Sequence, residues 1–309
     1  MRLVFAGTPE VSVTALEAIV ASGHELVAVV TRPDAPAGRG RKLVASPVAQ
    51  YAEQLGGVEI LKPVKPSDPD FLARLKEIDP DCCPVVAYGG LLPQAALDIP
   101  RHGWINLHFS VLPAWRGAAP VQHSIISGDD VTGASTFRIV KALDAGPVYG
   151  VLTEPIGPKD TAGDLLTRLS VSGAKLLVDT LDGIEAGVLQ AVEQPADGVT
   201  IAPKLTVEDA EINLKHPAQQ IDRLVRGCNP APGAWTTFRG ERLKVLATAP
   251  TDDELAPGVL EATKSSVKVG TGSKAIELVT VQPQGKKPMA GADWARGVRI
   301  TADDQLGSE

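Results

Sequence analysis

Short apolar runs recur along the first ninety residues and alternate with segments of a different spacing. The runs cover residues 2–6, 26–30, 58–61 and 84–87, each about as long as a buried strand. Between them, apolar residues recur at helical spacing within 13–20, 48–55 and 71–78. Strands that alternate with helices favour parallel pairing through right-handed crossovers. We therefore predict an α/β, doubly wound fold with a mostly parallel sheet.

The pattern changes in the second half of the chain. Residues 132–140 and 147–156 alternate as strands do, and Asp160-Thr161 resembles a helix N-cap. Pro and Gly then punctuate residues 187–207, and from about Gly233 short β-rich runs lie between Gly and Pro turns. Such runs are typical of a small all-β barrel of the OB type. We predict a first domain over 1–187, a linker over 188–207 and an OB-like domain over 208–309.

The turn after the first strand lacks the chemistry of a phosphate-binding turn. It is Gly7-Thr8-Pro9, not the G-x-G-x-x-G of dinucleotide-binding Rossmann folds, and no G-x-x-x-x-G-K-[ST] loop occurs. The fold is therefore predicted to be Rossmann-like in architecture, without a nucleotide being implied.

Three polar residues of complementary chemistry stand in apolar sequence. Asn106 and His108 lie two apart in the apolar stretch that starts at Trp104, so as part of a strand they would share one face. An amide N–H and an imidazolium N–H can both donate to a developing oxyanion. Asp144, about forty residues further on, could orient the imidazole and favour its charged form. These residues could stabilise a tetrahedral intermediate of acyl transfer.

A protein nucleophile is missing from this set. Ser110 has no G-x-S-x-G elbow around it, and no cysteine is near in sequence, which favours direct transfer between two bound substrates. A purely structural role for these residues is the alternative, because a lone His or Asn in a strand is often structural and an Asp before Ala-Gly often marks a turn. No metal site is predicted, because His102, His108 and His123 lack the usual pairing with an acid.

A Pro- and Gly-rich loop over residues 33–47 carries Arg39, Arg41 and Lys42. A solvated surface loop would explain the cluster. Its position after the second strand, where α/β folds bind ligands, favours contacts with phosphates instead. The residues alone leave both interpretations open.

Composition, charge and cysteine content add expectations about the class of protein, its partners and its compartment. The 309 residues are 44% apolar and 22% charged, as in ordinary globular proteins, and no apolar stretch approaches a membrane span. The net charge of −7 divides unevenly: residues 1–209 carry 17 basic and 25 acidic side chains, and residues 210–309 carry 13 and 12. A polyanion would therefore rest more easily on the C-terminal third. Three cysteines fit no disulfide framework, and without a signal peptide we expect a cytoplasmic protein.

The motifs around these residues resemble the folate-dependent formyltransferase family. Residues 106–120 read NLHFSVLPAWRGAAP, and 143–146 read LDAG. The resemblance extends along the chain through FAGTP at 5–9, GRGRKLVASPV at 38–48, VAYG at 86–89, APKLT at 202–206 and RGCNPAPGAWT at 226–236. The central motif fixes only the type of reaction. The basic loop and the C-terminal elements resemble the members that formylate an aminoacylated tRNA.

The resemblance implies a role for each matched residue. Asn106, His108 and Asp144 match the catalytic trio, and Arg39, Arg41 and Lys42 match an insertion that contacts the tRNA acceptor stem. Three segments match the folate pocket and its turn, namely Val86, Ala87, Tyr88, Gly89, Gly90, Leu91 and Leu92, then Ser110, Val111, Leu112 and Pro113, and finally Ala142 and Leu143.

The implied reaction moves the formyl group of 10-formyltetrahydrofolate to the methionine α-amine of aminoacylated initiator tRNA. We expect no metal and a monomer. A formyltetrahydrofolate hydrolase, a sugar-nucleotide formyltransferase and a non-catalytic RNA-binding protein remain alternatives. Three departures from the family pattern are Val111, Gly90 and Ala231, where Leu, a larger polar residue and an aromatic residue are usual.

Overall fold

A computed structural model of the chain describes residues 1–37 and 42–307. The chain forms two compact units, each assembled from several segments. The first unit comprises residues 1–117, 131–155 and 166–201, and the second comprises 118–130, 156–165 and 202–309. No helix among the described residues combines the length and the apolar character that crossing a membrane requires.

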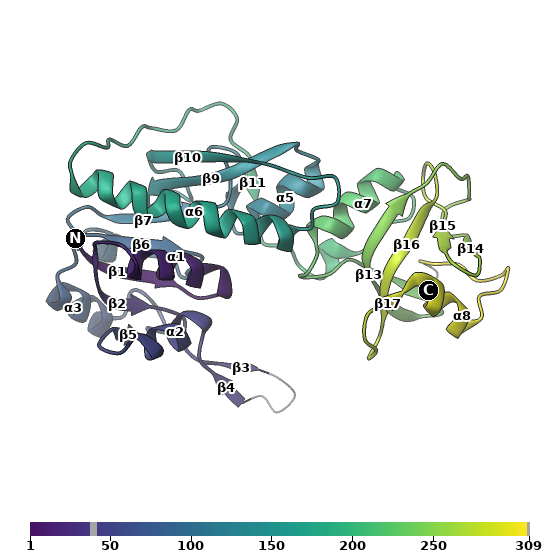
Figure 1. Cartoon of the computed structure of the whole chain (residues 1–309), viewed down its shortest axis with the longest axis horizontal. Helices are drawn as coiled ribbons and strands as arrows, with labels where there is room; N and C mark the ends of the chain where they lie inside the picture. Colours follow the sequence, from purple (N-terminus) through teal and green to yellow (C-terminus); the bar gives the residue numbers. More distant parts are fainter. Residues whose placement is uncertain (38–41, 308–309) are drawn as a thin grey trace. The chain divides into compact units, whose positions relative to one another are not determined.

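A seven-stranded sheet forms the centre of the first unit, in the order β10-β9-β7-β6-β1-β2-β5 (Figure 1). Five strands pair in parallel, and β9 and β10 are antiparallel to β7 and to each other. Their bounds are β1 Arg2–Gly7, β2 Glu25–Val30, β5 Glu59–Leu61, β6 Cys83–Val86, β7 Trp104–His108, β9 Val131–Arg138 and β10 Val148–Pro155. The predicted doubly wound, mostly parallel architecture is confirmed.

Helices cover both faces of this sheet because its central strands are apolar on both sides. Their bounds are α1 Glu10–Val20, α2 Pro47–Leu55, α3 Pro69–Ile78, α4 Gln94–Leu97 and α6 Ala162–Glu185. On one face, Phe71 and Leu75 of α3 pack in a cluster with Val4 and Trp104. On the other face, α6 comes so close to β7 that a Cβ at Gly173 would lie 3.1 Å from Leu107. Buried residues thus alternate between faces along β1 and β7.

Two small strand pairs accompany the large sheet. β3 Ala35–Ala37 and β4 Lys42–Val44 form an antiparallel hairpin, and β8 Arg116–Gly117 pairs with β11 Ile201–Ala202. The β3–β4 hairpin lies in the predicted basic loop. The β3–β4 pair follows β2 in sequence and β8 follows β7, in the regions where candidate site residues were predicted.

The second unit contains a six-stranded antiparallel sheet that curls into a half-barrel. Strands β12 Trp235–Phe238, β13 Glu241–Pro250, β16 Ile276–Pro283, β15 Val267–Val269 and β14 Leu260–Ala262 follow one another in space, and β17 Met289–Ala290 pairs with β16. Bridges from Gln305 and Leu306 reach Val259 and Phe238, near its two edges. The predicted OB-like β architecture is confirmed.

Helical segments complete the second unit. They are α5 Pro120–Ser127, the 3₁₀ turn η1 Glu208–Ala210, α7 Ala218–Gly227 and α8 Gly291–Val298. Ile221 and Val225 of α7 and Trp294 of α8 join the strand residues in one apolar cluster. Helices α4, α5, α7 and α8 were not predicted from the sequence; the eight residues of α8 lie close behind the last β-rich run.

Candidate active site

Asn106 and His108 lie at the carboxyl end of β7. This strand pairs in parallel with β6 and antiparallel with β9, so Asn106 is flanked by Val85 and Phe137, whereas His108 is paired on one side only, with Ser135 of β9. Leu107 between them faces α6, and the two polar side chains therefore leave the opposite face of the strand. Carboxyl ends of parallel strands are where doubly wound sheets place their ligands.

The imidazole of His108 is buried, with its side chain 6% exposed. Its Nε2 lies 2.8 Å from the carbonyl oxygen of Trp115 and donates to it, because a carbonyl can only accept. Phe137 contacts the ring edge-on, with 6.3 Å between the two ring centroids. Nδ1 is thus the ring nitrogen that can exchange a proton or donate to a substrate.

Burial lowers the pKa of His108 below the usual histidine value of 6.5. The negative charge of Asp144 and the hydrogen bond to Trp115 act in the opposite direction and raise it. The neutral ring is therefore the resting form near pH 7, and its protonated form depends on the neighbouring carboxylate.

Asp144 provides that carboxylate. Its Oδ2 lies 3.8 Å from Nδ1 of His108, which is longer than a hydrogen bond, and accepts a hydrogen bond of 2.8 Å from the backbone N–H of Gly117. The carboxylate is thus tied to the loop after β7 as well as to its own turn. The structure brings His108 and Asp144 together, as the sequence predicted.

Asn106 is partly exposed, unlike its neighbours in β7. Within residues 1–37 and 42–307, no hydrogen bond is found for its side-chain amide. The amide therefore keeps both N–H donors available at the end of the strand. This is the state that a donor to an incoming oxyanion would need.

The backbone at the site is strained at three positions. Ala87, Trp115 and Asp144 have φ values of 47°, 59° and 45°, in the left-handed region that non-glycine residues seldom adopt. Ala87 follows β6, Trp115 supplies the carbonyl group that accepts from His108, and Asp144 carries the carboxylate of the site. Strained non-glycine residues tend to cluster at functional sites, where surrounding contacts hold them in place.

No side chain is suited to act as a covalent nucleophile among the described residues near the site. Ser110 is fully buried, and its hydroxyl donates to the carbonyl of Ala114 at 2.6 Å. Burial raises the pKa of the Cys82 thiol to about 12 and holds that of Cys83 well above its usual value. Neither thiol forms a thiolate at neutral pH.

The predicted folate residues fall into exposed and buried groups. Leu91 is 87% exposed and Leu143 58% exposed, so both offer apolar surface. Tyr88 instead lies in the core against the α3 face, so its ring offers no surface to a ligand, and its carbonyl oxygen accepts a hydrogen bond of 2.8 Å from the Thr8 hydroxyl. At Gly90 a Cβ would lie 2.7 Å from the Tyr88 ring, which explains the absence of a larger residue there.

The rest of the predicted folate set lies in the loops around these residues. Val86 ends β6, whereas Ala87, Gly89 and Ala142 are exposed and Leu92 is partly buried. In the turn after β7, Leu112 is buried, and Val111 and Pro113 are partly buried. Part of the backbone of this turn is bonded within the protein, because the Ser110 carbonyl accepts from Ser135 and the Leu112 N–H donates to Ser135.

Of the predicted tRNA-binding residues, Lys42 begins β4 and is exposed. Arg39 and Arg41 lie outside the described residues. Leu43 beside Lys42 is 70% exposed. Because successive side chains of a strand alternate, Lys42 and Leu43 expose a cationic and an apolar side chain on opposite faces of β4.

Two residues assigned to the predicted linker were missed by the sequence analysis. Gln194 and Thr200 make hydrogen bonds to the loops that carry Asp144 and Trp115. No spacing in the sequence points to them, because the segments they bridge are fifty or more residues away. A glutamine in a Pro-containing segment has no distinguishing local pattern.

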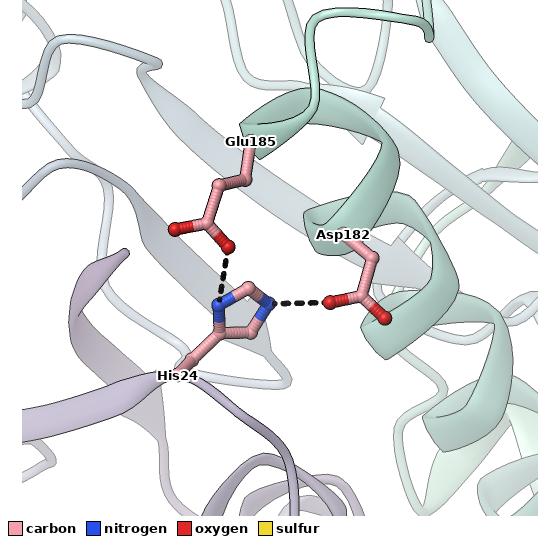
Figure 2. Close-up of side chains that lie close together, drawn as sticks. All are labelled: His24, Asp182 and Glu185. Carbon is pink, nitrogen blue, oxygen red and sulfur yellow. Dashed lines mark ion pairs between the residues drawn. The ribbon is translucent and has the colours of Figure 1, made fainter.

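A second cluster of ionisable groups lies at the far end of α6, where His24 stands between Asp182 and Glu185 (Figure 2). Nε2 of His24 is 3.3 Å from Asp182, and Nδ1 is 3.3 Å from Glu185. Each carboxylate faces a different ring nitrogen, so the three groups do not converge on one point as metal ligands do. The cluster ties α6 to the residues before β2.

Two family models match most of the chain. Residues 1–181 match the family model described as formyl transferase, and residues 204–299 match that described as formyl transferase, C-terminal domain. The chain belongs to the formyl transferase family. Methionyl-tRNA formyltransferase of Streptomyces avermitilis is 68% identical over 311 residues, with both chains covered completely.

Two solved structures share the fold at low identity. WlaRD, a sugar 3N-formyl transferase determined with dTDP and 5-N-formyl-THF, matches with a TM-score of 0.68 and 16% identity over 93% of this chain and 99% of that one. HypX from Aquifex aeolicus, in complex with tetrahydrofolic acid, matches with a TM-score of 0.66 and 17% identity over 96% of this chain. The chain spans about half of HypX, 47% of its length.

Proposed function

We propose that this chain transfers the formyl group of 10-formyltetrahydrofolate to the α-amine of methionine on aminoacylated initiator tRNA, which supplies N-formylmethionyl-tRNA for translation initiation. The full-length similarity to methionyl-tRNA formyltransferase is the observation that carries the proposal. The available Asn106 amide and the His108–Asp144 pair suit the chemistry of formyl transfer.

In the proposed reaction the methionine amine attacks the formyl carbon, and a new C–N bond forms. The oxygen of the resulting tetrahedral intermediate accepts hydrogen bonds from the Asn106 amide and from His108 Nδ1, which takes up the proton that the attacking amine loses. The proton lost by the attacking amine reaches N10 of the folate, the bond from N10 to the formyl carbon breaks, and tetrahydrofolate leaves. Asp144 orients His108 and stabilises its positive charge while this proton moves.

We assign the two substrates to different parts of the chain. The folate would contact the exposed positions within 86–92 and 142–143 and the turn 110–113, mainly through backbone groups. The tRNA would contact Arg39, Arg41 and Lys42 and the domain over 208–309, since residues 210–309 carry 13 basic and 12 acidic side chains, against 17 and 25 in residues 1–209. Residues 1–187 would form the catalytic domain, with 188–207 as the linker.

We further propose a monomer that works in the cytoplasm. Its three cysteines are buried free thiols, in keeping with a reducing compartment. The proposed steps use only groups of the chain and its two substrates, with no metal and no covalent enzyme intermediate. Sedimentation at micromolar concentration tests the monomer, and a dimer would contradict it.

A sugar-nucleotide acceptor is the second candidate, because WlaRD shares the fold. The proposal is tested by supplying 10-formyltetrahydrofolate with charged initiator tRNA, charged elongator methionine tRNA, or a dTDP-amino sugar. We expect formylation of the initiator tRNA at the highest rate. Formylation of the sugar alone would establish the second candidate, and release of formate without transfer would establish a hydrolase.

A further inference from the structure

The segment of residues 190–201, here called the return segment, follows α6 and passes over the active-site loops. It is joined to the start of β10 by two backbone hydrogen bonds of 2.8 Å between Val148 and Val192. It has no helix or strand before β11, which begins at Ile201, and most of its side chains are exposed. Gln194 is an exception, because its side chain is partly buried.

The carboxamide of Gln194 bridges two loops of the site. Its Nε2 donates to the carbonyl oxygens of Asp144 and Gly146, each at 2.8 Å. Its Oε1 accepts from Nε and Nη2 of Arg116, at 3.1 and 2.7 Å. Both N–H groups and the carbonyl oxygen of this side chain are therefore engaged. One glutamine joins the turn of the site carboxylate to the loop after β7.

The return segment also holds that loop at a second point. Oγ1 of Thr200 accepts from the backbone N–H of Trp115 at 2.8 Å, and the carbonyl of Thr200 accepts from the N–H of Arg116 at 2.9 Å. The carbonyl of Trp115 in turn holds Nε2 of His108. Together with the His108–Asp144 contact, these hydrogen bonds connect Gln194, Asp144, His108, Trp115 and Arg116 in one closed network.

Backbone strain in the two loops explains why this network of contacts is needed to hold them. Trp115 and Asp144 both have positive φ, which a free loop would relax because their Cβ atoms disfavour it. The return segment bonds to the backbone at both residues. Without these bonds the Asp144 turn would keep the bond of its carboxylate to Gly117 and the backbone bonds from Ala145 to Ala142 and from Arg138 to Pro147, but nothing would tie it to Arg116, and its position relative to His108 would vary.

We propose that Gln194 is a positioning residue for formyl transfer, which fixes Asp144 relative to His108 by tying the Asp144 turn to Arg116. The inference rests on the proposed function. The return segment is then part of the catalytic apparatus as well as a connection between the two units of the chain. Gln194 itself contacts neither His108 nor the position of the reacting atoms among the described contacts.

Two substitutions at Gln194 distinguish the positioning of Asp144 from a role limited to anchoring Arg116. Gln194→Leu removes every hydrogen bond of the side chain. Gln194→Glu keeps an acceptor for Arg116 but loses the donors to Asp144 and Gly146. If Gln194 served only to anchor Arg116, Gln194→Glu would behave as the wild type does. Gln190→Leu, at an exposed glutamine close by, is the matched control.

We expect both Gln194 variants to lower kcat by roughly 10- to 100-fold, the scale of a small misplacement of catalytic groups, with KM for either substrate within about twofold. The control should keep wild-type rates. Wild-type kcat in Gln194→Leu, or in Gln194→Glu, overturns the proposal. So does a loss of kcat that only parallels a lowered urea midpoint of unfolding.

A measurement independent of turnover separates this inference from the proposed function. The ¹⁵N titration of the His108 ring should move to lower pH in Gln194→Leu, because Asp144 is no longer held near it. An unchanged titration overturns the positioning role even if no acceptor is formylated. Should Gln194→Leu fail to fold, Thr200→Val against Thr200→Ser tests the other end of the segment. Only the valine variant should lose rate, and equal rates for the two would contradict the proposal.

Discussion

Oδ2 of Asp144 lies 3.8 Å from Nδ1 of His108 while the same oxygen accepts a hydrogen bond of 2.8 Å from Gly117. The carboxylate is thus close enough to stabilise a positive charge on the ring without being bonded to it. Because Nε2 of His108 is engaged by Trp115, the space between Nδ1 and Oδ2 is where a proton can be exchanged. The protonation of His108 should therefore respond to any change at Asp144.

We expect the pKa of His108 to lie below 6.5 in the wild type and to fall further in Asp144→Asn, because burial then acts without the opposing negative charge. The ¹⁵N shifts of the ring, followed from pH 8 to pH 4, measure both values. A higher midpoint in Asp144→Asn would contradict the electrostatic role of the carboxylate.

The same shift links pH to stability. The folded pKa lies below the unfolded one, so the unfolded state binds the proton more readily. The contribution of neutral His108 is complete above the unfolded value near 6.5 and is lost as pH falls through the folded pKa. His108→Gln should weaken this acid-side dependence of the free energy of unfolding. The surface residue Glu185 also has a lowered pKa, and it contributes equally to the pH dependence of stability in the wild type and in His108→Gln.

Asn106→Ala should reduce kcat on the order of 10²- to 10³-fold, the usual cost of one lost oxyanion donor. KM for the folate should change little, because the donor acts on charge that develops in the transition state. Asn106→Asp keeps the size of the side chain but brings a negative charge to the oxyanion, so its steady-state rates should be at least as low. Unchanged turnover in either variant would remove Asn106 from the mechanism.

Lys42→Ala should weaken tRNA binding and leave folate binding unaltered. A lost phosphate contact should lower the slope of log affinity against log salt by about one unit. Lys76→Ala, at an exposed lysine of α3, is the control. If the tRNA KM and the salt slope matched those of the control, the hairpin would be an ordinary solvated surface.

Gly146→Ala should destabilise the fold by roughly 1–3 kcal/mol, the usual range for an overpacked site. A Cβ at this position would lie 1.7 Å from the carbonyl oxygen of Arg138, which belongs to the backbone of β9 and cannot swing aside. The turn that carries Asp144 would have to move, so kcat should fall as well. Gly23→Ala, where a Cβ meets open space, should leave the urea midpoint and the rates unchanged.

Much of the fold could be predicted because burial imposes a visible period on the chain. Leu3 and Phe5 face one side of the sheet and Val4 and Ala6 the other, so β1 appears as a continuous apolar run. The short antiparallel strands of the second unit were likewise visible through their turns. Helix α8 was not predicted because its eight residues make too few turns to show a helical period of apolar residues.

The proximity of His108 and Asp144 was predicted from residue type and motif, but the contacts that hold them were not. Gln194 acts on backbone carbonyl groups, which have no residue signature, and its partners lie about fifty and eighty residues away. Tyr88 shows the opposite limit. The motif marks it for the folate pocket, whereas its ring fills the core, as only the packing of α3 could reveal.

Direct formyl transfer from folate to the methionine of charged initiator tRNA is tested by a single-turnover experiment. The protein is mixed in excess with formyl-labelled 10-formyltetrahydrofolate and charged tRNA, then quenched over time. We predict that the label passes into N-formylmethionine with none bound covalently to the protein at any time. Label on the protein, or none on the methionine, would contradict the account.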